Sequence, residues 1–264
     1  MIVLERIVKY FHRGSINQVL ALDHLGLRVE RGDFITIIGS NGAGKSTLLN
    51  CLAGSYGLDA GHILVDDRDI TAWPEHRRAA YISRVFQDPL LGTCGSLSIE
   101  QNLALAQRRC SRHGLGRGVK QKDRQLFREQ LQHLGLGLEN RLQDRVGLLS
   151  GGQRQALTML MATLVRPEIL LLDEHTAALD PKTAQQILDL SARLVQEQEL
   201  TALMVTHNMR QALALGNRLI MLHQGQVILD VAGEEKTAMR VEDLLERFYA
   251  VRGEVFSQDR MLLV

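Results

Sequence analysis

The chain has 264 residues, of which 45% are hydrophobic, and it carries a formal net charge of +1 at pH 7. The hydrophobic fraction is ordinary for a globular protein, and the near-zero net charge gives no reason to expect nucleic acid as a partner. No run approaches the ~18 consecutive apolar residues of a membrane-spanning helix, and Glu5, Arg6 and Lys9 interrupt the start, where a secretory signal would lie. We therefore expect a cytoplasmic protein that meets a membrane only through a partner.

The predicted elements begin with strands. Residues 1–30 contain apolar runs at 2–4 and 19–29 that partly alternate with polar residues, which is typical of an antiparallel sheet. Residues 31–88 and 155–230 carry strands and helices in alternating order, which predicts a core with a mainly parallel sheet. We expect an α/β fold in which the first segment adds an antiparallel part to that core.

A helical segment interrupts the core, and a helical tail follows it. Residues 89–150 are predicted to be mostly helical, with helices over 98–107 and 122–134. The tail, residues 231–264, contains an amphipathic pattern over 234–249 that predicts a helix closing the fold. This division makes the chain one domain with an inserted helical part.

A glycine-rich loop lies in the first part of the core. Residues 34–38 predict a buried strand and residues 47–53 predict a helix with an apolar face. The loop that joins them fits the spacing G-x-x-x-x-G-K-[ST] and consists of Gly39, Ser40, Asn41, Gly42, Ala43, Gly44, Lys45, Ser46 and Thr47. Its glycines allow backbone N–H groups to form an anion nest, while Lys45 supplies a charge for the β- and γ-phosphates and Ser46 a hydroxyl for Mg²⁺. The loop predicts a nucleoside triphosphate site and by itself leaves kinases, GTPases and helicases open.

Two later strands deliver polar side chains to the edge of the sheet where ligands bind. Residues 169–172 are apolar and are followed by Asp173, a candidate for holding Mg²⁺ through water, and Glu174, a candidate general base. Residues 203–206 are followed by His207, which could bond the γ-phosphate and position the attacking water. The plainer alternatives are a buried strand that ends in solvated acids and an ordinary surface histidine.

Two further motifs complete the pattern. Gln87 is a candidate polar sensor, because its amide could reach Mg²⁺ or the attacking water. Residues 149–153 read Leu-Ser-Gly-Gly-Gln and lead into a helix predicted over 153–164. Because a helix N-terminus attracts negative charge, this motif predicts a second anion site formed by Ser150, Gly151, Gly152 and Gln153.

With these motifs in this order, the chain from about residue 2 to about 248 resembles the nucleotide-binding subunits of ABC (ATP-binding cassette) transporters. The glycine-rich loop matches the family's Walker A motif, Gln87 its Q-loop, and residues 149–153 its signature. Asp173 and Glu174 match its Walker B motif, residues 178–180 its D-loop, and His207 its switch histidine. The resemblance implies a P-loop NTPase core, an N-terminal antiparallel β subdomain and an inserted α-helical subdomain.

The resemblance also implies an ATPase that works as a pair. The signature of one subunit would face the γ-phosphate held by the other, so that a homodimer, or a pair with a second ABC subunit, encloses two MgATP. Ser46, Gln87 and Asp173 would hold the Mg²⁺ ion. By spacing, Phe11 would stack on adenine, with Tyr10 as the alternative residue and an ordinary core aromatic as the alternative role.

As a family member, the chain would hydrolyse ATP to drive an integral membrane permease at the inner face of the cell membrane. The sequence segments around Asp173 and His207 resemble those of a bacterial subgroup of these ATPases that is associated with amino-acid uptake. This predicts import of a small solute, with a periplasmic or lipoprotein solute-binding protein in the complex. The main alternative is a soluble ABC ATPase of the iron–sulfur assembly type. A non-hydrolysing nucleotide switch is disfavoured because Glu174 and His207 are both present.

Three features are not accounted for by the motifs. His175 stands where the family usually has proline, which should change the stiffness of the chain after Glu174. Residues 108–124 are basic and form either a solvated loop or a contact with the permease or with anionic lipid. The cysteines Cys51, Cys94 and Cys110 lack metal-ligand spacing and predict free thiols in a reducing compartment.

Overall fold

The computed structural model describes residues 1–109 and 118–252, so that Cys110 and residues 111–117 of the basic segment 108–124 lie outside the described residues. The chain forms two compact units. The first contains Met1–Arg78 and the chain from Thr201 on, and the second contains Ala79–Leu200. The subdomain boundaries expected from the sequence divide the chain differently and stay a prediction.

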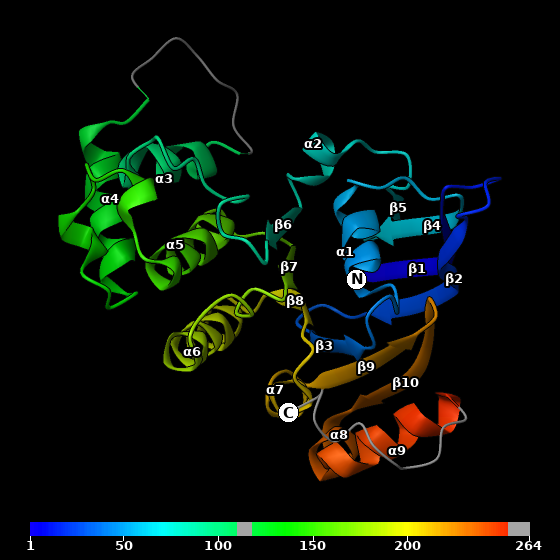
Figure 1. Cartoon of the computed structure of the whole chain (residues 1–264). Helices are drawn as coiled ribbons and strands as arrows, with labels where there is room; N and C mark the ends of the chain where they lie inside the picture. Colours follow the sequence, from blue (N-terminus) through cyan, green and yellow to red (C-terminus); the bar gives the residue numbers. More distant parts are fainter. Residues whose placement is uncertain (110–117, 253–264) are drawn as a thin grey trace. The chain divides into compact units, whose positions relative to one another are not determined.

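The first unit contains an antiparallel sheet (Figure 1). Its strands, in the order β2-β1-β4-β5, are β1 (Ile2–Phe11), β2 (Val19–Val29), β4 (Ala60–Val65) and β5 (Arg68–Asp69). The long strands β1 and β2 pair from Ile2 with Val29 to Phe11 with Val19. The sheet therefore includes the predicted N-terminal strands and also two strands from residues that the sequence pattern assigned to the parallel core.

The same unit contains a mainly parallel group of strands. These strands, in the order β10-β9-β3-β8, are β3 (Phe34–Gly39), β8 (Thr201–Val205), β9 (Arg218–His223) and β10 (Gln226–Ala232). β3 runs parallel to both β8 and β9, and β10 pairs antiparallel with β9. All five residues of β8 are buried, as expected for a strand covered on both faces.

The helices of the first unit are α1 (Lys45–Ala53), α2 (Glu75–Arg78), α7 (Met209–Ala214), α8 (Gly233–Ala238) and α9 (Val241–Arg252). The prediction of a helix over 234–249 was wrong in one respect, because the pattern spans two helices. Met239 has an extended conformation with ψ of 145°, and the Arg240 N–H donates to the Asp243 carboxylate at 2.7 Å. The new helix then packs Leu244 and Phe248 against a core formed with α7, β9 and β10.

The second unit combines two parallel strands with a group of helices. The strands are β6 (Ile82–Val85) and β7 (Ile169–Asp173), which pair in parallel register. The helices are α3 (Ile99–Gln107), α4 (Gln121–Gln132), α5 (Gly151–Thr163) and α6 (Pro181–Glu197), with short 3₁₀ turns at Leu138–Asn140 and Val146–Leu148. Figure 1 shows α3, α4 and α5 together, and they share a buried apolar cluster that includes Leu103, Phe127 and Leu157.

Local hydrogen bonds explain why these helices begin where they do. Ser98 caps α3 in a reciprocal pair with Gln101, and Asp180 caps α6, whose first residue is Pro181. The predicted helices over 98–107 and 153–164 agree with α3 and α5 to within two residues. In the described residues 1–109 and 118–252, no helix has the length and apolar character needed to cross a membrane.

Candidate functional site

The glycine-rich loop joins β3 to α1, as the sequence predicts. Gly39 and Gly44 have positive φ angles of 152° and 99°. A Cβ atom at Gly39 would lie 2.2 Å from the Leu222 carbonyl oxygen, and one at Gly44 would lie 2.5 Å from the Ala21 carbonyl oxygen. Only glycine satisfies both requirements at these positions. The backbone of the loop can therefore lie closely against its neighbours and curve into a concave surface.

Lys45 is folded into this loop. Its side chain is 6% exposed, and its ammonium group donates to the carbonyl oxygens of Gly39 at 2.8 Å and Ser40 at 3.1 Å. These bonds hold the positive charge inside the curve of the loop. Ser46, the next residue, is exposed at the first turn of α1, where a hydroxyl can reach a ligand.

His207 lies at the same edge of the parallel strands as the glycine-rich loop. β3 and β8 are parallel neighbours in which Ile37 pairs with Val205, and the Thr206 N–H donates to the Ile37 carbonyl at 3.1 Å. The carboxyl ends of both strands therefore meet at one edge. His207 is exposed there, and Asn208 directly after it caps α7 by accepting from the Gln211 N–H at 3.1 Å.

Phe11 is the last residue of β1 and is half-buried. Its ring meets the Tyr56 ring edge to face at a centroid distance of 5.3 Å, and the Lys9 ammonium lies 5.7 Å from its centroid. Tyr10, the alternative, has the Arg13 guanidinium 5.4 Å from its ring centroid. A half-buried ring with contacts on some sides retains surface for stacking, and the adenine role of Phe11 stays a prediction.

In the second unit, Asp173 is the last residue of β7, and Glu174 and Gln87 lie just after the carboxyl ends of β7 and its parallel neighbour β6. Val85 at the end of β6 pairs with Leu172 in β7, so both strands end at one edge. Glu174 has a φ of 42°, a left-handed conformation that is uncommon for a residue with a side chain. Such a conformation is found where the surrounding structure imposes it, often at functional sites.

Arg84 was not predicted from the sequence, yet it contacts a predicted site residue. Its guanidinium Nη2 lies 2.6 Å from the Asp173 Oδ2 atom, and the two side chains are 12% and 11% exposed. The same guanidinium lies 4.7 Å from the centroid of the Phe86 ring. The only signal in the sequence was a basic residue beside apolar ones, three positions before Gln87.

The helix that follows the signature also reaches this region. Gln155 is 1% exposed, and its side-chain nitrogen donates to the Phe86 carbonyl at 3.3 Å. This bond connects the second turn of α5 to the residue directly before Gln87. Nothing in the sequence pointed to Gln155 beyond its place next to the signature.

The signature residues form the start of α5. Ser150 Oγ accepts from the Gln153 N–H at 3.3 Å, and Gln153 Oε1 accepts from the Ser150 N–H at 3.2 Å. The Gln153 side chain therefore caps the helix. The N–H groups of Gly151 and Gly152 stand at the helix start, where α5 offers them no carbonyl partner. Gly151 and Ser150 are exposed, so a negatively charged ligand has access to the positive end of the helix dipole.

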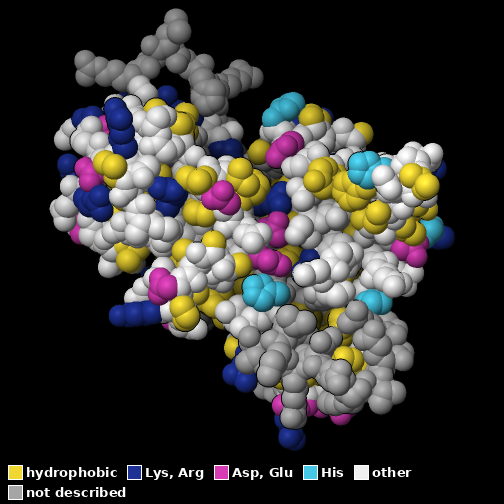
Figure 2. All heavy atoms as spheres, in the orientation of Figure 1, with side chains coloured by type: hydrophobic (Ala, Val, Ile, Leu, Met, Phe, Trp, Pro, Cys, Tyr) yellow, Lys and Arg dark blue, Asp and Glu magenta, His cyan; other side chains and the backbone are white. Residues whose placement is uncertain are grey.

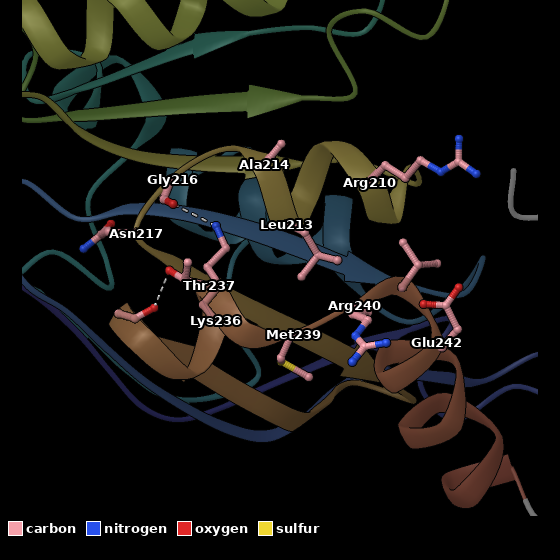
Figure 3. Close-up of a pocket in the computed structure, with 12 residues that line it drawn as sticks. Arg210, Leu213, Ala214, Gly216, Asn217, Lys236, Thr237, Met239, Arg240 and Glu242 are labelled. Atoms are coloured by element: carbon pink, nitrogen blue, oxygen red, sulfur yellow. Dashed lines mark hydrogen bonds between the residues drawn. The ribbon is translucent and has the colours of Figure 1, made fainter.

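A separate pocket of about 800 Å³ lies in the first unit among α7, α8 and the start of α9 (Figure 3). None of the predicted site residues lines it. Lys236 at its back is 3% exposed and donates to the carbonyls of Leu215 and, at 2.8 Å, Gly216. Burial lowers the pKa of Lys236 to about 8. Its bonds to carbonyls just past the end of α7 assign this lysine a structural role.

The basic segment 108–124 divides into two kinds of residue. Arg109 donates to Ser83 Oγ and to the Val165 carbonyl, and Arg124 bonds both oxygens of Glu100, at 2.8 and 3.2 Å. Lys120 and Lys122 are exposed at the start of α4. Figure 2 shows basic side chains on the surface of this helical region, interspersed with acidic ones. Part of the predicted basic surface is thus used in contacts within the unit.

Comparison with protein families matches residues 22–177 to the family described as ABC transporter. The chain belongs to the ABC transporter family. This ABC ATPase is 47% identical over 230 residues to the tyrosine transport ATP-binding protein of Clostridioides difficile (strain R20291). The alignment covers 87% of this chain and 91% of that protein. It is 38% identical over 224 residues to a phosphonates import ATP-binding protein of Frankia casuarinae, with 81% and 85% of the two chains covered.

Solved structures give the same family. A dimeric ATP-binding cassette in a post-hydrolysis state, bound to ADP and Pi, has a TM-score of 0.75 and 28% identity, covering 88% of this chain and 98% of that one. A nucleotide-free cassette has a TM-score of 0.74 and 26% identity, covering 93% and 95%. The predicted ABC ATPase fold is confirmed, and the cassette binds and hydrolyses ATP.

Proposed function

We propose that this ABC ATPase drives the import of a small solute of the amino-acid class through a membrane permease. The observation that carries the proposal is the 47% identity to a tyrosine transport ATP-binding protein along nearly the whole of that protein. Further relatives have methionine import and thiamine import in their names, at 34% and 36% identity. The solutes of these two relatives differ, but both names specify import of a small molecule.

The nucleotide would bind first at the glycine-rich loop. Its backbone N–H groups would hold the phosphates, and the Lys45 ammonium, now bonded to two loop carbonyls, would exchange those bonds for bonds to the β- and γ-phosphates. Phe11 would stack on the adenine ring. The remaining loop residues assigned to the nucleotide are Ser40, Asn41, Gly42, Ala43 and Thr47.

Ser46, Gln87 and Asp173 would hold Mg²⁺. The described residues contain no group of three His, Cys, Asp or Glu side chains that could bind a metal ion by themselves, so the ion would depend on phosphate oxygens as well. Asp173 fits this role because its little-exposed carboxylate already accepts a positive group, the Arg84 guanidinium, at 2.6 Å. When bound, Mg²⁺ would neutralise charge on the β- and γ-phosphates.

Glu174 and His207 would act on the attacking water. Glu174 would accept a proton from it, and the left-handed φ of 42° aims the carboxylate differently from a continuing strand. His207 is exposed at its strand end and would hold both the water and the γ-phosphate. Both side chains position and polarise the water, which is the main contribution that a protein makes to phosphoryl transfer.

The signature would serve the nucleotide of a second subunit, in a homodimer or in a pair with a related subunit. The exposed start of α5 would bring the N–H groups of Gly151 and Gly152, and the Ser150 hydroxyl, to the γ-phosphate held by the partner. Gln153 would contribute by fixing the helix start, since its side chain caps α5. Closure would be stabilised by ATP because these contacts exist only in the closed pair.

Hydrolysis would remove the shared phosphate and open the pair. Gln87 and the helical part of the chain would pass this movement to the permease, which would hold the ATPase at the inner face of the membrane. An extracytoplasmic solute-binding protein would deliver the solute.

Gly151 offers a sharp test of the paired mechanism. Gly151 is exposed at the first position of α5, and a Cβ there meets nothing closer than Leu179 Cδ2 at 3.4 Å. Gly151→Ala should therefore be tolerated. Gly151→Asp adds a carboxylate that the dipole of its own helix favours, so the free subunit should be stable. A unit charge about 4 Å from a phosphate is disfavoured by about 4 kcal/mol at an effective dielectric constant of 20.

We therefore expect Gly151→Asp to bind ATP at the glycine-rich loop but to lose ATP-dependent dimerisation and at least ~10²-fold of its turnover. Gel filtration with light scattering and phosphate release would measure the two effects, with Gly151→Ala as the matched control. Full turnover of Gly151→Asp would contradict the paired mechanism.

Transport itself needs a membrane assay. The ATPase should copurify from detergent-solubilised membranes with a multi-span permease, and the reconstituted complex should take up labelled tyrosine or a related amino acid in an ATP-dependent manner. Recovery with soluble assembly proteins and no permease would favour the iron–sulfur assembly alternative.

A further inference from the structure

The residue that follows Glu174 is a buried histidine. The His175 side chain is 2% exposed, and its Nε2 atom lies 2.9 Å from Oγ of Ser191 in α6. Ser191 is itself 1% exposed. A polar pair at this depth keeps one geometry because neither partner can replace the hydrogen bond with one to water.

A second hydrogen bond fixes the direction of the first. The Ser191 hydroxyl donates to the Ile187 carbonyl oxygen, 2.7 Å away. A serine hydroxyl has only one hydrogen, so Oγ must accept from His175, and the proton lies on Nε2. Burial lowers the pKa of His175 to about 4, so the ring is neutral at pH 7.

This bond ties the end of β7 to the middle of α6. Beyond His175 the chain continues to Asp180, whose carboxylate accepts from the Thr183 N–H at 3.1 Å and caps α6. The intervening residues 176–179 are therefore held at both ends by the same helix. At one end the anchor is a side chain inside the unit, and at the other it is the helix cap.

We propose that His175 is a positioning residue for Glu174 and acts through its hydrogen bond to Ser191. The proposal rests on the role in hydrolysis proposed above for Glu174. Proline, which the family resemblance predicts at this position, would stiffen the chain through its ring. In this chain the buried side-chain anchor supplies the restraint instead.

The anchor acts on the backbone that carries the Glu174 carboxylate. A residue with a side chain keeps a left-handed conformation only where its surroundings impose it. Because His175 fixes the peptide that follows Glu174, loss of the anchor would let this turn relax and displace the carboxylate. A displacement of about 1 Å can lower turnover by ~10²-fold, whereas ATP binding depends on the phosphate loop and should change little.

Ser191→Ala tests the proposal, and Thr163→Val is its matched control. Thr163 is 3% exposed in α5, and its hydroxyl donates to the Met159 carbonyl four residues earlier at 3.0 Å, as Ser191 does to Ile187. Both substitutions remove a buried hydroxyl from a helix of the same unit. We expect Ser191→Ala to lower kcat by ~10-fold or more with the KM for ATP within ~2-fold, and Thr163→Val to leave both constants within ~2-fold.

The proline variant gives a second, independent comparison. In a His175→Pro background the anchor is already absent, so adding Ser191→Ala should change kcat by less than ~2-fold. Equal kcat values for Ser191→Ala and Thr163→Val would overturn the proposal, and this comparison holds even if His175→Pro does not fold. An equally large effect of Ser191→Ala in both backgrounds would also overturn it.

The two hypotheses about this segment fail differently. If Glu174→Gln retains full turnover, the assignment of Glu174 itself is wrong. If Glu174→Gln is inactive while Ser191→Ala keeps its kcat, Glu174 keeps its role and only the positioning role of His175 is wrong.

Discussion

The ion pair between Arg84 and Asp173 gives a prediction with a magnitude that follows from the structure. The 2.6 Å contact joins two side chains that are 12% and 11% exposed, so neither charge is well solvated. Removing one partner of a fully buried pair lowers stability by about 3–5 kcal/mol, because the remaining charge loses this interaction while it stays shielded from water. Since both groups here retain some exposure, we expect Arg84→Met to lower the free energy of unfolding by about 2–3 kcal/mol.

A double-mutant cycle separates this pair from the other contacts of Arg84, which include the Phe86 ring. Arg84→Met, Asp173→Asn and the double variant would be unfolded in urea and followed by circular dichroism. The coupling free energy should be about 2 kcal/mol. Arg128→Met, the same substitution at an exposed arginine of α4, should change stability by no more than ~0.5 kcal/mol.

The same cycle bears on the proposed metal site, through a readout other than turnover. The Arg84 guanidinium competes with Mg²⁺ for the Asp173 carboxylate. In Arg84→Met, the Mg²⁺ concentration needed to strengthen the binding of a non-hydrolysable ATP analogue should therefore be lower than in the original protein. A coupling free energy below ~0.5 kcal/mol would show that the contact contributes too little to support this reasoning.

The remaining predictions concern turnover, binding and pH. Glu174→Gln should lower turnover by at least ~10²-fold, retain ATP binding and accumulate an ATP-bound dimer, so normal phosphate release would exclude it as the base. Lys45→Ala should weaken ATP binding itself, as measured by calorimetry, and unchanged affinity would contradict the phosphate-loop assignment. Because burial lowers the pKa of Lys236 to about 8, the folded chain binds fewer protons than the unfolded chain above that pH, and the stability contributed by Lys236 should rise with pH up to ~10.4. Urea unfolding at about pH 7.5 and 9.5 would measure how the free energy of unfolding of the original protein changes relative to that of Lys236→Met. We expect the difference to grow by up to ~1.4 kcal/mol per pH unit, and the same pH dependence in both proteins would refute the prediction.

The sequence predicted those parts of the fold that local chemistry determines. The helix predicted over 98–107 corresponds to α3, which begins directly after Ser98, a good cap residue. The glycine pattern of the phosphate loop, between an apolar strand and an apolar helix, was enough to locate the turn from β3 into α1. In these places the residues that decide the structure are neighbours in the chain.

The parts that were missed depend on contacts between distant residues. β4 pairs with β1 in the antiparallel sheet, and nothing in the residues of β4 themselves indicates which of the two sheets the strand joins. The sequence is amphipathic throughout 234–249, yet the helix is interrupted at Met239. This interruption depends on the hydrogen bond that the Arg240 N–H donates to the Asp243 carboxylate. Arg84 and Ser191 act through partners 89 and 16 residues away in the chain, so their importance could not be read from their own neighbourhoods.

Gly152 is constrained from within its own unit. A Cβ atom there would lie 2.2 Å from Cγ2 of Thr183, the residue whose N–H completes the cap of α6. This contact lies within one subunit, so it does not depend on dimerisation. A subunit that never dimerised would still need glycine at position 152 for α5 and α6 to pack as they do. A glycine at this position is therefore poor evidence that a related protein still hydrolyses ATP. A selection for second-site revertants of Gly152→Ala should yield smaller residues at position 183.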